Sequence, residues 1–397
     1  MAARIDANIN KETINFICAQ IGVTTAFLAK KTGLAEDKVG LWLDASNDAY
    51  PTLNQAKTLA KALKVPFAGL YMQKDNLPIK QLPSLRNLRT LQYASVDESS
   101  LNLAIAELIR CHEFLISAES ELDITARLLA LPTIPDTASV AEYAGLIRTY
   151  FKLELNDQFK LQSARQFYLY IRQQVENKGI FVHCFTGVDV EVARGISIFN
   201  ETAPIVGIND NDRYPAKTFS IIHELVHILK KQSTLCNEMF TSFSSQNEEV
   251  FCNAVAGEVL VPTASLRVVL TAQKITSFSL DTIEAIAKKY SVSKEVIIRR
   301  LYDTDRISKD EYETYANEIR QNFEKERQAQ KVARKEGRAP KIAKVPSREA
   351  VDKTSPAICK VLLIGYGDGY FSKQEVSGLL GIKEKHIPKF LTEVAKW

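Results

Sequence analysis

The feature that most constrains this chain is the pentapeptide His223-Glu224-Leu225-Val226-His227, set in a run of apolar residues. Residues four apart on a helix share one face, so both imidazoles can reach a single metal ion. The glutamate after the first histidine can then accept a proton from a water at the open coordination position. The apolar flanks favour a buried helix over the alternative, a surface helix with two solvated histidines.

A second helix is expected over residues 247–262, where apolar residues recur with helical spacing before a closing proline. Glu249 lies 22 residues after His227, which leaves room for a turn and a return. We therefore expect Glu249 to be the third metal ligand. Glu248 and Glu258 are competing candidates for the same role. The alternative interpretation of Glu249 is an ordinary, solvent-exposed glutamate on a helix.

Asn253 lies one helical turn beyond Glu249 and suits the role of orienting a metal-bound imidazole through its other nitrogen. Two histidines, one carboxylate and a water make up the hydrolytic zinc arrangement. Structural zinc sites, in contrast, are usually closed and rich in cysteine. The pattern therefore predicts Zn²⁺ in a hydrolytic site.

Residues 194–262 resemble the ImmA/IrrE family of zinc metallopeptidases, whose two helix motifs have counterparts in 217–227 and 249–262. The resemblance implies that His223, His227 and Glu249 hold zinc. It also implies that Glu224 is the catalytic general base. The departures from the family pattern change packing rather than chemistry, and they are Cys252, Val255 and Gly257.

The first 72 residues predict a compact helical unit punctuated by glycine and proline. Residues 24–34, followed by a helix that holds Trp42, resemble the helix-turn-helix of phage repressors (the XRE type). Helices are expected at Lys11–Ile21, Thr25–Lys31, Glu36–Leu43, Leu53–Ala62 and Phe67–Tyr71.

In such a domain the helix from Glu36 would enter the major groove of DNA. Its reading positions open with Glu36 and Asp37 and contain none of the arginine, asparagine or glutamine side chains that normally read bases. Contacts with double-stranded DNA would then rest on lysines that bind phosphates, for which Lys30, Lys31 and Lys38 are the candidates. The alternative is a repressor fold reused for protein contact.

The fold class expected is α+β and mostly helical. Strands are expected at 179–185, 195–199 and 204–208, the last two as a hairpin that could pair with an extended substrate. Six segments are expected: a repressor-like helix-turn-helix domain (1–72), a connector (73–93), a zincin-like peptidase domain with a small sheet (94–265), a helical module with helix-turn-helix rhythm (266–320), a basic linker (321–350) and a small C-terminal helical module (351–397).

Composition gives no strong pointer to nucleic acid or membrane, because the net charge is only +4 and no apolar run is long enough to span a bilayer. The six cysteines are scattered without paired spacing, so we expect free thiols and a cytoplasmic protein. Of the remaining histidines, His183 is expected to be a packed core residue. His112 lacks metal-ligand spacing, and His386 is expected to be solvated.

Two function classes follow. In the first, the chain is a zinc endopeptidase that cuts a regulatory protein, such as a repressor or toxin–antitoxin partner encoded nearby, as the family resemblance implies. In the second, it is a DNA-binding transcriptional regulator or antitoxin-like partner whose zinc site is structural or vestigial. The intact Glu224 favours the first class, because a structural site has no use for a general base. An oligomer is compatible with both.

Overall fold

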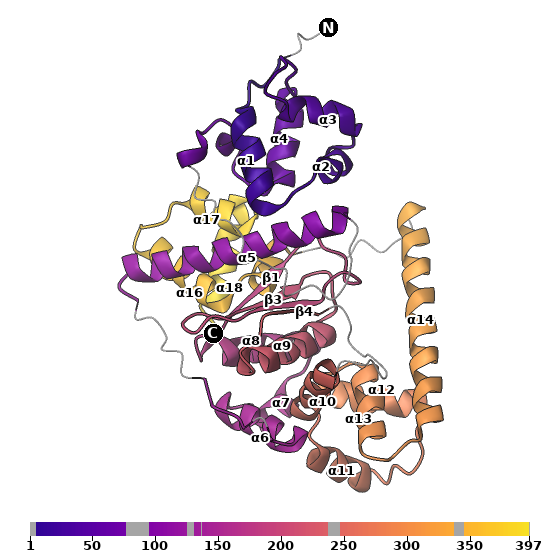
Figure 1. The fold of residues 1–397 in the computed structure, drawn as a ribbon. Helices are drawn as coiled ribbons and strands as arrows, with labels where there is room; N and C mark the ends of the chain where they lie inside the picture. The colour runs from indigo at the N-terminus through magenta and orange to yellow at the C-terminus, as the bar shows by residue number, and fades with distance from the viewer. Residues whose placement is uncertain are drawn as a thin grey trace. The chain divides into compact units, whose positions relative to one another are not determined.

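A computed structural model describes residues 5–76, 95–124, 131–135, 137–236, 247–336 and 345–396. The chain divides into two compact units, residues 1–114 with 185–193, and residues 115–184 with 194–397. Helices dominate both units, and a small sheet accompanies the helices of the second (Figure 1). The α+β, mostly helical class is therefore confirmed, whereas the division into six segments stays a prediction.

The first unit begins with the helices expected from the sequence, to within one residue at each end (Figure 1). Side-chain caps and left-handed glycines set these bounds. Thr24 caps α2 by accepting a hydrogen bond from Phe27, while Gly22 and Gly33 end α1 and α2 at φ of 74° and 70°. The elements are α1 (Lys11–Ile21), α2 (Thr25–Thr32), α3 (Glu36–Leu43), α4 (Leu53–Ala62), η1 (Phe67–Leu70), η2 (Lys74–Asn76) and α5 (Ser95–Glu121), which continues into the second unit.

A buried lysine fixes the end of α3. The Lys11 ammonium donates hydrogen bonds to the carbonyls of Leu41, Asp44 and Asn47 at 3.1, 2.8 and 2.7 Å. It also lies 4.7 Å from the centroid of the Tyr50 ring. Cations at a helix C-terminus satisfy carbonyls that the helix leaves without partners, so Lys11 ties α1 to α3. The connector expected at 73–93 lies mostly outside the described residues.

The second unit contains a four-stranded sheet in the order β1-β3-β2-β4, with β2 antiparallel to both β3 and β4. The three strands expected from the sequence are present. The fourth, β4, has only three residues and was not expected. The first elements of this unit are α6 (Val140–Tyr150), α7 (Leu155–Lys160), α8 (Ala164–Glu176), β1 (Phe181–Phe185), β2 (Gly195–Ile198), β3 (Ile205–Asn209), α9 (Tyr214–Leu229) and β4 (Thr234–Cys236).

Helix α9 is the centre of this unit. Every residue from Ala216 to Leu229 is buried, because α8, α10 (Asn247–Leu260) and strands β2 and β3 all pack against it (Figure 1). This explains why the helix is apolar nearly all round. The remaining helices are α11 (Thr263–Ala272), α12 (Leu280–Tyr290), α13 (Lys294–Asp303), α14 (Lys309–Lys335), α15 (Pro346–Lys353), α16 (Pro356–Gly367), α17 (Lys373–Leu380), η4 (Glu384–His386) and α18 (Ile387–Val394).

The structure shows the secondary structure at both ends of the basic linker expected at 321–350, whose boundaries stay a prediction. Helix α14 continues through Lys335 and α15 begins at Pro346, so helix occupies both ends of that range. The residues of the second half of α14 are mainly Glu, Lys, Arg, Gln and Ala, which are the strongest helix formers. Their charge suggested a solvated linker, but their helix propensity prevailed.

Helix α15 is attached to the start of α9. The Asp352 carboxylate accepts hydrogen bonds from Arg165 at 2.9 Å and from the Tyr214 hydroxyl at 2.5 Å. Next to it, the Lys353 ammonium lies 2.8 Å from Asp210, which also pairs with Lys217 of α9. The C-terminal helices are thereby fixed to the helix that carries the pentapeptide.

Among the described residues, no single helix is both long and apolar enough to cross a membrane. Two pairs of consecutive helices reach that length and composition only when taken together, and they are bent by 109° and 50°.

Candidate metal centre

Three side chains from two helices converge on one point. The Nε2 atoms of His223 and His227 on α9 lie 3.1 Å apart, and each lies close to a different carboxylate oxygen of Glu249 on α10, at 3.2 and 3.3 Å. All three donor atoms lie within 4.8 Å of one another, and both imidazoles are buried. Two neutral imidazoles and one carboxylate are a donor set that suits zinc, so these residues fit the ion that the sequence implies.

Glu249 is held in its ionised form. Burial alone would raise the pKa of this carboxyl group, but hydrogen bonds and charge from His223 and His227 outweigh burial and hold the pKa well below its usual range. A deprotonated carboxylate is the form that binds a metal.

The two competing acids are engaged elsewhere. Glu248 accepts hydrogen bonds from Lys230 at 2.8 Å and from Gln232 at 2.7 Å. Glu258 forms an ion pair with Arg300 and also accepts a hydrogen bond from the Thr263 hydroxyl. Of the three candidates for the third ligand, the structure brings only Glu249 to the histidines.

The Nδ1 atom of His227, which points away from Glu249, is close to Gln232. It lies 3.2 Å from the Oε1 of Gln232, which accepts a hydrogen bond when that nitrogen carries the proton. Such partners fix the tautomer and ring orientation of a metal-binding histidine. The sequence pointed instead to Asn253, which is buried but forms no hydrogen bond through its Oδ1 within the described residues. Its orienting role stays a prediction. Gln232 was missed because it follows the helix in a turn, where no periodic pattern marks it.

Glu224 is buried beside the cluster, against the sheet. The Thr234 hydroxyl of β4 donates a hydrogen bond to its Oε2 at 3.4 Å. Glu224 also packs directly on the backbone of Gly195 in β2, the strand next to β4. A Cβ at that position would lie 2.8 Å from both Cγ and Cδ of Glu224, closer than real side chains approach. Gly195 therefore makes room for Glu224, a requirement that the sequence showed only as a glycine opening a strand.

The other histidines lie away from this cluster. His183 stacks on Phe181 with 5.7 Å between ring centroids and accepts a hydrogen bond from the backbone N–H of Ser355, as a packed residue does. Burial lowers the pKa of His112 on α5. His386 lines a surface groove in the C-terminal helices.

The candidate DNA-binding residues are exposed. Lys30 and Lys31 lie in the last turn of α2, and Lys38 lies on the outer face of α3 beside the equally exposed Glu36 and Asp37. Of these three lysines, Lys31 has a cation–π contact, because its ammonium lies 5.4 Å from the centroid of the Phe27 ring.

Comparison with known families gives one match. Residues 176–302 match the family described as the IrrE N-terminal-like domain of peptidase M78. The matched range contains both histidines, Glu224 and Glu249, and it covers less than half of the chain. It supports the resemblance to ImmA/IrrE proteins in this region and a metallopeptidase-type function. No curated protein and no solved structure matches the chain.

Proposed function

We propose that this chain is a zinc-dependent endopeptidase. The observation that carries the proposal is the convergence of His223, His227 and Glu249, with the Glu224 carboxylate buried next to them. Three protein ligands leave the fourth position of a tetrahedral ion open, as in hydrolytic rather than structural zinc sites. The buried Glu224 further supports hydrolysis, because it has the chemistry of a general base.

Zinc, when bound, acts as a Lewis acid and makes water nucleophilic at neutral pH. Glu224 accepts the proton of the attacking water and returns it to the amide nitrogen of the departing peptide. Thr234 and Gly195, on two neighbouring strands, hold this carboxylate in place, and Gln232 orients His227. Because Glu224 and both imidazoles are shielded from bulk solvent, their interactions are stronger than they would be in water.

The substrate we propose is a regulatory protein, specifically a repressor or toxin–antitoxin partner encoded by a neighbouring gene. This rests on the family resemblance. The hairpin strand β2, expected to pair with an extended substrate, has partners on both sides, namely β3 and β4. A substrate strand would instead add to β4, the outermost described strand on that side of the sheet.

The test is co-expression with the products of the neighbouring genes, followed by mass analysis of any fragments. Wild-type protein should cut one of these products at a defined bond. Glu224→Gln preserves shape but cannot accept the proton, so cleavage should fall by about 100- to 10,000-fold. Cleavage at the wild-type rate by Glu224→Gln would show that the chain does not act as this peptidase.

A DNA-binding regulator is the second candidate function, and the first unit is the observation that favours it. Its α2 and α3 occupy the ranges expected for a repressor-like helix-turn-helix, with Lys30, Lys31 and Lys38 exposed. A gel shift on the promoter of the chain's own operon tests this candidate. Retardation by Glu224→Gln as strong as that by the wild-type protein would show DNA binding independent of cleavage. No retardation at low salt would leave protein docking as the role of this unit.

We further propose that the protein acts in the cytoplasm, since five described cysteines are free thiols, as in reducing compartments.

A further inference from the structure

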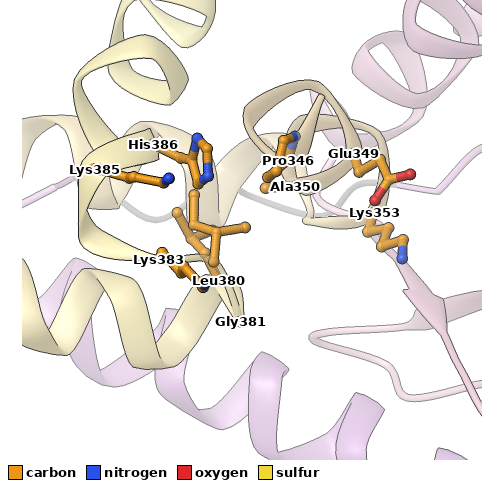
Figure 2. A pocket seen from close by; sticks show the side chains of 10 residues that line it. Pro346, Glu349, Ala350, Lys353, Leu380, Gly381, Lys383, Lys385 and His386 are labelled. Carbon is orange, nitrogen blue, oxygen red and sulfur yellow. The ribbon is translucent and has the colours of Figure 1, made fainter. Parts of the chain in front are cut away.

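The C-terminal helices form a surface groove of about 460 Å³. Helix α15 provides one wall, and the segment that connects α17 to α18 provides the other. Figure 2 shows Lys385 and His386 facing Pro346 and Ala350 across this groove. The metal centre and the family match both lie outside it, so neither accounts for it.

The groove carries an excess of positive charge. Three lysines line it, Lys353, Lys383 and Lys385, against the single carboxylate of Glu349. Lys353 is paired with Asp210, whereas Lys383 and Lys385 form no ion pair with any described residue. Unneutralised cations on the rim of a groove favour an anionic occupant.

The floor of the groove is apolar and only partly covered. Leu380 and Ile382 form the outer layer of a small core that contains Cys359 and Phe390. An occupant that covers these side chains removes apolar surface from water, which favours binding. Recognition would therefore combine an apolar anchor with flanking negative charge.

One wall is already fixed in position. The hydrogen bonds of Asp352 to Arg165 and Tyr214 hold α15 against the rest of the unit. A groove with a fixed wall loses less conformational entropy when it is filled. It also opens at the surface with its charges on the rim, which suits a chain segment better than an enclosed small molecule.

We propose that this groove binds an acidic peptide segment of a partner protein. A leucine-like side chain of the peptide packs on Leu380 and Ile382, and carboxylates on either side of it pair with Lys383 and Lys385. The proposal is independent of peptidase activity.

Fluorescence anisotropy with the full-length protein tests it. The probes are a labelled peptide that combines glutamate with leucine, the same peptide with serine in place of leucine, and a labelled DNA duplex. Saturable binding is expected for the glutamate–leucine peptide alone. The double variant Lys383→Glu/Lys385→Glu should weaken it by about 10-fold or more, because like charges repel.

Lys360→Glu/Lys389→Glu is the matched control, since both lysines are exposed on neighbouring helices, α16 and α18, and neither lines the groove. It should bind the peptide as the wild type does. Equal binding of the serine peptide or the duplex would overturn the proposal, because it would show a general polyanion surface. Absence of saturable binding, or equal loss in both double variants, would overturn it as well.

Discussion

The candidate functional side chains of α9 are buried, whereas those of α2 and α3 are exposed to solvent. His223, His227 and Glu224 are at most 2% exposed, and the two histidines converge with Glu249. Lys30 and Lys38 are exposed, and no ion pair joins them to another residue in the part of their unit that the structure describes. A buried polar group is costly unless it is satisfied, so its presence implies a partner. An exposed lysine costs little and implies no partner. The cluster of His223, His227 and Glu249 therefore supports a firmer functional conclusion than the exposed lysines of the first unit.

The largest expected effect is a loss of zinc affinity when the right glutamate of α10 is removed. Glu249→Ala should remove one of three ligands and reduce zinc affinity by more than the roughly 10- to 100-fold typical of outer-shell changes. Glu258→Ala should leave zinc affinity nearly unchanged, because its partners are Arg300 and Thr263. Competition with a chelator measures both. Loss of zinc from the Glu258 variant, with Glu249→Ala unaffected, would show that the wrong acid was assigned.

Gly195→Ala should come next in size. The added methyl group collides with Glu224 and displaces its carboxylate, and misplacement by about 1 Å can cost roughly 100-fold in rate. Zinc content should stay unchanged, because the ligands are on α9 and α10. The comparison is turnover of the identified substrate, with Gly40→Ala as control, since a Cβ at Gly40 meets nothing within 4 Å. Full activity in Gly195→Ala would show that catalysis does not depend on the contact between Glu224 and the backbone of Gly195.

Gln232→Ala should have a smaller effect. It removes the group that orients His227, and outer partners of this kind contribute about 10-fold or more in metal affinity. Chelator competition again gives the value. If Asn253→Ala lowered affinity more than Gln232→Ala did, the role expected for Asn253 would be supported and the one inferred here for Gln232 would fail.

The smallest effect is expected in the first unit. If it binds DNA through phosphates, each lysine lost should reduce the salt dependence of binding by about 0.9 in a double-logarithmic plot. Lys30→Ala/Lys31→Ala should therefore flatten that slope without changing zinc content. A slope equal to that of the wild type would remove these two lysines from any DNA contact.

The sequence predicted the parts of the molecule that depend on local rules. Glycines such as Gly22 and Gly33 ended α1 and α2, and the pentapeptide on an apolar helix indicated both histidines of the cluster. Glu249 was expected from its place on the second helix, and the family resemblance then singled it out from Glu248 and Glu258.

The rest depends on contacts between distant segments. Gly195 matters only because β2 lies against Glu224, and Gln232 matters only because a turn brings it to His227. Strand β4 has three residues, too few to show a period. Propensity within α14 outweighed a charge pattern that suggested a linker. In each case the information lies in tertiary packing, which a single sequence does not display.

If His223, His227 and Glu249 hold one zinc ion, elemental analysis of the purified protein should detect it. Wild-type protein should contain one zinc per chain. His227→Ala should contain almost none while keeping its helical circular dichroism, because two remaining ligands hold zinc poorly. A full complement of zinc in His227→Ala would show that His227 is not a zinc ligand and that the proposed site is wrong.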